Sequence, residues 1–598
     1  MKRIHFLLPF VVAVAWFGCS SERDEFGGDS NLFAVPDAGG DACTGELSCS
    51  RDSRQVIDCS GKVIETCSED KACGNGQCLD LCSAAATNEG SVGCSFAVPP
   101  PFDDTPGTRG GCYALFVANN APLPANLHIE AGGVQGELES TVWIPSVVNG
   151  TVTHTKLEGP IPPGTGAVVF LSNKSEKTEP YQTLCPVGTK SVFDDEGTIV
   201  GTGIGHATLV TSDVPVSMYA MYPYGGAGAW IPSAMLLLPT ASYSTNYILA
   251  TSWGSNSDRF GTDTLRSANT VPTTPRDPGI QIVAVEDDTS IDVRPRVDII
   301  GTQDVAAGAR DEVVTYRLDR GGVLQILQHN DLVGSVIESN KPVGVFGGHN
   351  GMYVPVDVAF ADLDQTQIPP VSAWGHEYAI LPAPNRVDLF SRGTEKAPDP
   401  SPVRLVGAVS GTELTYEPMR PQGAPDHLDS GELAVFFAND PFVVRSQDVE
   451  HPFFAMVLMT GAGATSYDKG DPESVLALAT DQWLSNYLFF SDSSYDSSSV
   501  YVTRRKFEGA FHDVTLDCAG PLEGWRRITD DYEWTYVELS WFGDPVPYAG
   551  GTCADGTHRI SSDAPFGTTV WGLAMDASYG YPGGASLARH TPVQVSVH

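Results

Sequence analysis

A proline-centred segment occurs four times in the chain at similar intervals. The four copies read TSDVPVSMYAM, ESNKPVGVFGG, DVEHPFFAMVL and SSDAPFGTTVWGLAM. Their prolines are Pro215, Pro342, Pro452 and Pro565, separated by 127, 110 and 113 residues. Proline fixes φ and lacks an N–H, so we expect it at the first residue or the edge of a strand. Recurrence at this period predicts four copies of one structural module.

A second recurring segment pairs an aromatic residue with a tyrosine four positions later. It reads LLPTASYSTNYILA from 237, IPPVSAWGHEYAIL from 368 and LALATDQWLSNYLFF from 476. The pairs are Tyr243 with Tyr247, Trp374 with Tyr378, and Trp483 with Tyr487. The first module has no clear copy. We expect Trp374 and Tyr378 to be buried at the start of a module, with Tyr247 and Tyr487 in equivalent places.

The local patterns are those of an all-β protein. Short runs rich in Val, Thr, Tyr, Phe and Trp alternate with Gly, Pro, Asp and Ser, which is typical of strands and turns. VAVEDDTSIDVRP and VGAVSGTELTYEP both read as β-hairpins. We predict tandem antiparallel β-sandwich-like modules, with a propeller-like closed arrangement of the four as the alternative. The predicted modules span 96–234, 235–364, 365–470 and 471–598.

The amino-terminal residues predict export. Lys2 and Arg3 precede an apolar stretch too short to span a bilayer, as in a secretory signal. A small residue directly before Cys19 resembles a bacterial lipoprotein processing site, so 1–19 is predicted to be a lipoprotein signal peptide ending at a lipidated Cys19. Cleavage without lipidation is the alternative. Acidic, Gly-rich residues 20–42 predict a flexible tether. We expect a lipoprotein of the bacterial outer membrane or cell surface, or a secreted protein.

Cysteine usage supports export. The chain has 13 cysteines, and setting Cys19 aside leaves an even number that could pair as disulfides. A dense group predicts a small disulfide-rich module at 43–95, and zinc is disfavoured there because no CxxC pair or nearby His is present. The dense group is Cys43, Cys49, Cys59, Cys67, Cys73 and Cys78. Cys82, Cys94, Cys112 and Cys185 are expected to fasten it to the first large module, and Cys518 and Cys553 to pair together.

Charge and motifs limit the function. A formal net charge of −38 argues against a nucleic-acid partner, which requires a clustered basic surface. HEYAI lacks the second His of a zinc-hydrolase motif, and the sister modules carry unrelated polar residues in place of His376 and Glu377. No GxSxG elbow or phosphate-binding loop is present. We predict a protein that is not an enzyme, although a pair of glycosidase carboxylates stays open.

Two groups of aspartates are candidate calcium ligands, and no other cofactor is predicted. Asp287, Asp288 and Asp292 cluster around a hairpin turn, while Asp362 and Asp364 lie in AFADLDQ. Carboxylate oxygens are the ligands that calcium prefers. The alternative is that aspartate is simply common in turns and on exposed faces.

Each proline segment leads into a loop rich in Gly and Tyr. The loops read YPYGGAGAW, GGHNGMYVP, TGAGATSYD and SYGYPGGAS. Tyrosine offers a large amphipathic contact area at low entropic cost, so these loops are candidate ligand-binding loops. The alternative is that they pack between modules. The candidate residues are Tyr222, Tyr224, Trp230, Tyr353, Tyr579 and Tyr581.

The succession SNKPVGVFGGHNGMYV, QIPPVSAWGHEYAILP and DPESVLALATDQWLSNYLFF resembles the amino-terminal domain family of the IgGFc-binding protein. The resemblance covers 96–590 and is most specific over 335–385. The lipoprotein signal and the cysteine-rich module resemble those of delta-proteobacterial surface proteins of that family. Animal members carry cysteines shortly after the Gly-His pair and this chain has none there, so the resemblance leaves immunoglobulin binding open. The resemblance implies a non-enzymatic adhesion or recognition protein for a glycoprotein, polysaccharide or other cell-surface partner. An extracellular polysaccharide hydrolase and a purely structural envelope protein are the alternatives.

Overall fold

The computed structural model describes residues 47–598 except 51, 104–107, 149–150, 175, 230 and 255–275. Strands dominate it, and the paired strands run antiparallel, which confirms the all-β class. Among the described residues no helix has the length and apolarity needed to cross a membrane. The predicted signal peptide, the lipidated Cys19, the tether and Cys43 lie outside the described residues.

The cysteine-rich segment consists of short strands followed by one helix. β1, β2 and β3 form one sheet, and β4 pairs with β5. Its bridges are Cys49–Cys73, Cys67–Cys78 and Cys82–Cys94, and Cys59 is also disulfide-bonded. The bridge at Cys94 ties α1 to the first strand of module 1, as expected. The elements are β1 Ser48–Cys49, β2 Gln55–Ile57, β3 Val63–Thr66, β4 Lys71–Gly74, β5 Gln77–Asp80 and α1 Leu81–Asn88.

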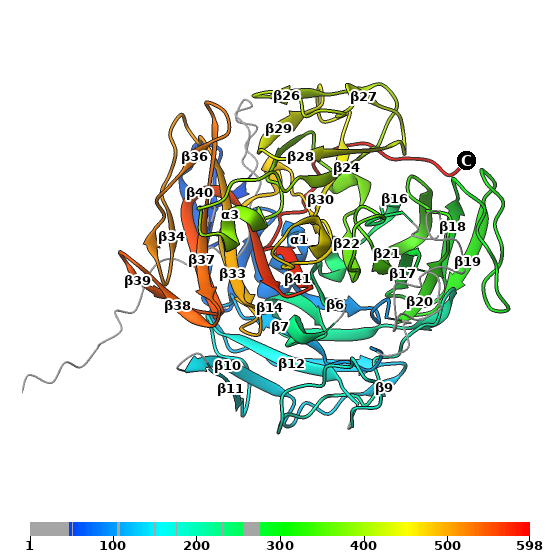
Figure 1. Ribbon diagram of the computed structural model, residues 1–598, viewed down its shortest axis with the longest axis horizontal. Coiled ribbons are helices and arrows are strands. Elements are labelled where there is room, and N and C mark those ends of the chain that lie inside the picture. The colour runs from blue at the N-terminus through cyan, green and yellow to red at the C-terminus, as the bar shows by residue number, and fades with distance from the viewer. Residues whose placement is uncertain are drawn as a thin grey trace, which may run out of the picture.

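Four groups of strands follow and surround a common centre, coloured cyan, green, yellow and orange to red in Figure 1. Module 1 contains β6 Val92–Val98, β7 Tyr113–Ala118, β8 Leu127–Ala131, β9 Val134–Gln135, β10 Val142–Val148, β11 Thr151–Lys156, β12 Gly166–Ser172, β14 Thr208–Tyr222 and β15 Ser233–Leu237. Module 2 contains β13 Gly203–His206, β16 Ser244–Ile248, β17 Pro278–Ala284, β18 Thr289–Arg294, β19 Val314–Leu318, β20 Gly322–Leu327, β21 Val336–Met352 and β22 Asp362–Ile368.

The other two modules follow the same plan. Module 3 contains β23 Glu377–Ile380, α3 Arg386–Phe390, β24 Ser401–Gly407, β25 Thr412–Glu413, β26 Thr415–Glu417, β27 His427–Leu428, β28 Leu433–Ala438, β29 Phe442–Arg445, β30 Phe453–Leu458 and β31 Ser474–Leu476. Module 4 contains β32 Leu484–Ser491, β33 Ser497–Arg505, β34 Val514–Leu516, β35 Gly520–Pro521, β36 Arg526–Arg527, β37 Tyr532–Trp541, β38 Asp544–Tyr548, β39 Gly551–Cys553, β40 Gly556–Ala574 and β41 Ala577–Pro582. Short 3-10 turns are η1 Gly226–Gly228, η2 Thr240–Ser242, η3 Val371–Ala373, η4 Ala462–Ala464 and η5 Thr480–Gln482.

One long strand organises each module. In module 2 the first half of β21 pairs with β16 and β18, and its second half pairs with β17 and β22. The two halves of β14 in module 1 and of β40 in module 4 likewise pair with different strands. In module 3 two separate strands, β29 and β30, take the place of the one long strand. Each module is therefore sandwich-like, with two small sheets joined through the long strand.

The repeated prolines mark the division between the two small sheets. Pro215, Pro342 and Pro565 lie inside β14, β21 and β40, where the pairing with β6, β16 and β32 shifts register. Only Pro452, directly before β30, lies at a strand start. The expectation of a strand edge or first residue was therefore wrong for three copies. The physical reason is that a bulge interrupts the ladder and leaves a position that needs no N–H donor.

The aromatic and tyrosine motif is buried, as expected, and its tyrosine bonds to the backbone beside the motif proline. Trp374 and Tyr378 are buried, and so are Tyr247 and Tyr487. The tyrosine hydroxyls donate to the carbonyl of the residue after the motif proline: Tyr247 to Val343, Tyr378 to Phe453 and Tyr487 to Phe566. The first module has Phe96 at the position of the motif tyrosine. Phe96 pairs with Val210, which lies as far before Pro215 as Ile337, the partner of Tyr247, lies before Pro342. Phenylalanine lacks the hydroxyl, which hid this copy in the sequence.

The last strand of each module lies at the centre. β15 contacts β22 and β41, and β31 contacts the same two strands, so these four strands form a closed ring. Modules 1 and 4 meet where the Ser91 amide donates to the Ala585 carbonyl at 2.7 Å, and where Phe116 stacks on Phe490. The propeller-like alternative thus describes how the sandwich-like modules are arranged. β15, β22 and β31 each end a few residues past the module boundary that the repeats indicated.

Two further disulfides lie within modules. Cys518 and Cys553 are bonded to each other, as predicted. Cys112 and Cys185 are also bonded to each other, and both belong to module 1, so they do not fasten the cysteine-rich segment to it. The sequence does not reveal this because cysteine spacing alone leaves the partners undetermined.

Candidate binding surface

The Gly- and Tyr-rich loops do not form an exposed surface. Tyr222, Tyr224, Tyr579 and Tyr581 are each at most 4% exposed. Tyr222 packs on Tyr113 inside module 1, and Tyr579 packs on Tyr495 inside module 4. Tyr224 and Tyr581 pack where modules 1 and 4 meet: the ring of Tyr224 stacks on Phe490, and Tyr581 packs against Tyr219. Closure of the ring buries these side chains, so the expectation of a binding surface is corrected in favour of packing between modules. Tyr353 is half-buried, and Trp230 lies outside the described residues.

The two groups of aspartates have different environments. Asp287 and Asp288 are exposed on the hairpin between β17 and β18, and Asp292 is half-buried. The Asp287 carboxylate accepts the Arg320 amide, and that of Asp292 accepts the Thr315 hydroxyl, as turn and cross-strand residues do. Asp362 and Asp364 are instead fully buried in β22 at the centre of the ring.

The conspicuous histidines have structural roles. His349, in the GGHNG segment, is fully buried; its Nδ1 accepts the Gly351 amide at 3.1 Å and its Nε2 lies 3.3 Å from the Gly254 carbonyl. Burial lowers the pKa of His349 to about 3, so the imidazole is neutral. Glu377 accepts hydrogen bonds from Arg445 at 2.7 Å and from Tyr532 of module 4 at 2.6 Å. It joins modules 3 and 4.

One cluster has metal-ligating residue types but is not a metal site. Asp517, Cys518 and His558 lie together, but the Cys518 sulfur is bonded to Cys553. His558 is held on both sides, with Nδ1 2.9 Å from the Asp517 carboxylate and Nε2 2.6 Å from the Ala554 carbonyl. This cluster therefore stabilises the outer part of module 4.

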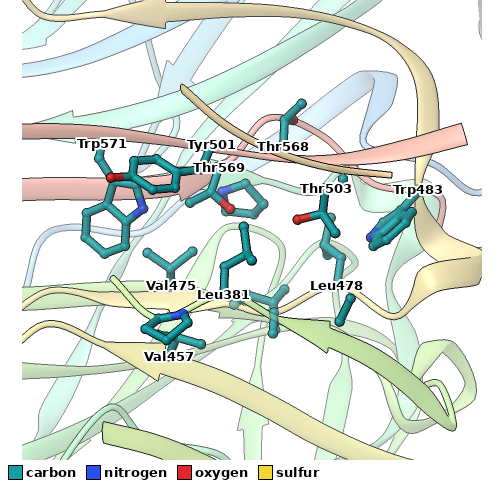
Figure 2. A pocket seen from close by; sticks show the side chains of 16 residues that line it. Leu381, Val457, Val475, Leu478, Trp483, Tyr501, Thr503, Thr568, Thr569 and Trp571 are labelled. Carbon is teal, nitrogen blue, oxygen red and sulfur yellow. The ribbon is translucent and has the colours of Figure 1, made fainter. Parts of the chain in front are cut away.

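A groove runs along the seam between modules 3 and 4. Its inner part is a cavity of about 50 Å³, shown in Figure 2, where Tyr501, Trp571 and Trp483 of module 4 face Leu381 and Val457 of module 3. A cavity of this size holds a few water molecules and is well below the several hundred Å³ typical of small-molecule pockets. The inner part is thus a packing seam, and a ligand must be sought further out.

The outer part of the groove is a shallow depression of about 80 Å³ that shares Leu381, Pro382 and Tyr501 with the inner part. Its wall is a stack of aromatic rings on β33 and β37. The Tyr501 ring lies 6.0 Å from that of Trp534 at an interplanar angle of 9°, and 5.2 Å from that of Tyr536 at 15°. Trp534 and Tyr536 are only half-buried, so this stack meets solvent.

Polar groups border the aromatic stack. The Arg526 guanidinium lies 4.9 Å from the ring centre of Trp534 and 5.5 Å from that of Tyr536, within range of a cation–π interaction. On the opposite side Asn385, Asp388 and the exposed Asn439 line the depression. The groove therefore combines flat apolar faces with amide, carboxylate and guanidinium groups.

Helix α3 positions polar residues on one side of the groove. Asn385 caps its first turn by accepting the Asp388 amide at 2.9 Å. Arg386 anchors the helix through two 2.8 Å hydrogen bonds to the Asp399 carboxylate, and a third bond reaches the Thr460 carbonyl. Because the Arg386 side chain is fully buried, the first turn of the helix is held firmly against module 3.

The groove residues were not predicted from the sequence. Trp534 and Tyr536 sit in YEWTYVELSW, where alternate positions of one strand carry aromatic residues. That alternation is the only sequence signal, and it equally fits a strand whose aromatic face packs against a core. The polar partners come from α3 and from the loop after β28, more than 80 residues earlier in the chain, so only the fold brings them together.

A separate cavity of about 490 Å³ lies in module 1. Leu127, Leu138 and Leu157 form its apolar lining. Asn126 lies at its edge and is bound to the Asp213 carboxylate by its amide at 2.7 Å. Its volume is in the range of small-molecule pockets.

Comparison with known proteins identifies the family. The family model described as IgGFc binding protein matches residues 233–572, which run from β15 into β40 and include the outer part of the groove between modules 3 and 4. The module 1 cavity lies outside the matched residues. A search of curated proteins and a search of solved structures each found no match. Since the match covers more than half of the chain, this protein belongs to the IgGFc-binding protein family.

Proposed function

We propose that this protein is a non-enzymatic recognition protein that binds carbohydrate, on a glycoprotein or a polysaccharide, through the groove between modules 3 and 4. The observation that carries the proposal is the stack of Tyr501, Trp534 and Tyr536 beside Arg526. Sugar rings present apolar C–H faces that pack on aromatic rings, and their hydroxyls need nearby hydrogen-bonding groups. The groove offers both.

Its shape supports a surface ligand. The depression is small and is bordered by the exposed Arg526 and Asn439, so it suits a short stretch of a chain that lies across the seam rather than a molecule enclosed on all sides. Trp, Tyr and Arg are also the residues that dominate binding energy at protein interfaces. Membership of a binding family, with the outer part of the groove inside the matched residues, agrees with this role.

The test uses the purified full chain on a glycan array and on immobilised polysaccharides. Trp534→Ala and Arg526→Ala should each weaken binding by about tenfold or more, because each removes more than 1.4 kcal/mol of contact energy at a hot spot. Trp534→Phe should retain part of the affinity. Met419→Ala, which is 76% exposed and does not line the groove, is the matched control and should bind normally.

Two results would refute this function. A folded wild-type protein that binds no glycan on either surface contradicts the carbohydrate ligand. Glycan binding that survives Trp534→Ala contradicts the groove. Treating a bound glycoprotein with glycosidases separates the sources, because loss of binding identifies its sugar as the ligand and retention identifies its polypeptide.

We also propose that the protein is exported and anchored at the bacterial surface through a lipid on Cys19. The basic start, the apolar stretch and the small residue before this cysteine support it. Metabolic labelling with a fatty-acid analogue should mark the wild-type protein and leave Cys19→Ala unlabelled. Equal labelling of the two proteins would rule out this anchor.

A further inference from the structure

The centre of the ring contains a group of buried carboxylates. Asp362 and Asp364 come from β22 of module 2, and Asp471 and Glu473 lie just before β31 of module 3. Each of the four residues is at most 1% exposed. The strands that carry or follow them belong to the closed central ring, so the group lies between modules rather than inside one sheet.

Serines from the surrounding modules complete the group. Ser233 of β15 donates to the Glu473 carboxylate at 3.3 Å, and the Ser474 hydroxyl donates to Asp364 at 2.8 Å. Ser578 of β41 donates to the backbone carbonyl of Asp471 at 2.6 Å. Each of the four modules therefore contributes oxygen atoms to the same buried region.

Three carboxylate oxygens in this region make no well-formed hydrogen bond, although the Ser578 amide faces Asp362 and the Asp364 carboxyl faces Glu473. They are both oxygens of Asp362 and Oε2 of Glu473. Within the described part of the chain, the nearby cations form their ion pairs elsewhere, Arg386 with Asp399 and Arg404 with Asp331. Neither forms an ion pair with Asp362 or Glu473. The charge of Arg404 still acts on Asp364, and that of Arg386 acts on Asp471. Fully buried carboxylates almost always have a partner, so these oxygens need a compensating positive charge, which a cation or a proton can supply.

The electrostatics agree with the geometry. Burial raises the pKa of Asp362 well above its usual value, and the neighbouring Asp471 and Glu473 raise it further. Burial likewise raises the pKa of Glu473, with the Asp364 charge adding to it. These carboxyls face one another, and each resists ionisation unless a cation or a proton compensates its charge.

We propose that Asp362 and Glu473 bind a hard divalent cation, calcium, at the centre of the ring. Among the described residues no three carboxylate ligand atoms of this group lie within 4.8 Å of one another. Calcium takes about six to eight oxygen ligands, so the proposed site requires water molecules to complete the shell around the ion. The ion joins module 2 to module 3 and thereby helps to close the ring. This site is independent of the partner that the groove binds.

The first experiment measures the metal directly. The wild-type chain, purified without chelator, should contain about one calcium per molecule by elemental analysis. Terbium, a calcium substitute, should become luminescent on excitation of tyrosine, because Tyr495 lies near Asp362 and Glu473, whose charges raise its pKa. Asp362→Asn and Glu473→Gln should each lose the metal and the luminescence. Asp288→Asn, on the exposed hairpin, is the matched control and should keep both.

The second experiment needs no variant, so it holds even if a substitution prevents folding. Calcium must displace protons from the carboxyls, so its affinity should fall by about tenfold or more between pH 7.5 and pH 5.5. Calcium should raise the melting temperature at pH 7.5, and a chelator should reverse the rise. A melting temperature indifferent to calcium, magnesium and chelator means that the carboxyls hold protons alone and overturns the site. Metal retained in the doubly substituted Asp362→Asn, Glu473→Gln protein overturns it as well.

Discussion

The hydroxyl of Tyr378 donates a hydrogen bond to the carbonyl of Phe453 at 2.6 Å and accepts one from the Gly375 amide at 3.1 Å. Phe453 directly follows Pro452, so the tyrosine joins the strand that opens module 3 to the point where its two small sheets divide. The same pair of bonds is made by Tyr247 in module 2 and by Tyr487 in module 4.

Replacing this hydroxyl should destabilise the protein. Tyr378→Phe leaves a buried amide and a buried carbonyl without their partner, so we expect the free energy of unfolding to fall by about 1–3 kcal/mol. Urea unfolding measures it. Tyr316→Phe is the control: its hydroxyl bonds the Ala306 carbonyl at 2.9 Å in a partly exposed position, where water can replace it. Equal losses in the two variants would argue against a special role for Tyr378.

The buried ion pair of Arg386 and Asp399 should be far more sensitive than an exposed one. Asp399→Ala leaves a fully buried guanidinium without its carboxylate, which should cost about 3–5 kcal/mol of unfolding free energy. Glu137→Ala removes the exposed partner of Lys190 and should cost less than about 1 kcal/mol. Chemical denaturation of both variants tests this contrast, and similar losses would contradict it.

The Cys518–Cys553 and Cys82–Cys94 disulfides should contribute different amounts to the free energy of unfolding. Replacing Cys518 and Cys553 with serine opens a bridge of 35 residues and should cost about 3–4 kcal/mol. The bridge between Cys82 and Cys94 spans 12 residues, so its removal should cost about 1 kcal/mol less by chain entropy. Thermal unfolding of the two double variants should rank them in this order. The reverse order would show that chain entropy does not decide their contribution.

The stability of module 4 should depend on the charge of His558. Burial by itself lowers the pKa of His558, but the hydrogen bond and charge of Asp517 outweigh it and raise the pKa above its usual value. The folded state therefore holds this proton more tightly than the unfolded state. The stabilisation is fully present below about pH 6.5, the unfolded value, and is lost as the pH rises through the folded pKa.

The test compares the wild type with Asp517→Asn by urea unfolding at pH 6 and at pH 9. The variant should be less stable at pH 6, where the wild-type imidazolium faces a carboxylate, and the difference should shrink at pH 9, where the imidazole is neutral. A difference in unfolding free energy that does not change with pH would exclude this pair as its source.

The sequence predicted the repeating units better than the surfaces. Strand propensity, the recurring prolines and the buried Trp374 and Tyr378 are local features, because each follows from how one strand packs on its neighbour. The copy at Phe96 stayed hidden since it keeps the position and loses the hydroxyl. The prediction of an exposed binding surface at the tyrosine loops was wrong, because a Gly- and Tyr-rich loop has the same composition whether it faces solvent or another module.

By itself, then, the sequence determined an all-β chain of four related modules with a disulfide-rich segment before them, since propensity, periodicity and cysteine density act over a few residues at a time. Only the tertiary structure decided that the modules close into a ring. Closure buries Tyr224 and Tyr581 between the first and last modules and gathers Asp362 and Glu473 at the centre. It also sets Trp534 of β37 beside Asn385 of α3 along the seam of modules 3 and 4. These contacts join residues more than a hundred positions apart, and no local pattern encodes which of them will meet.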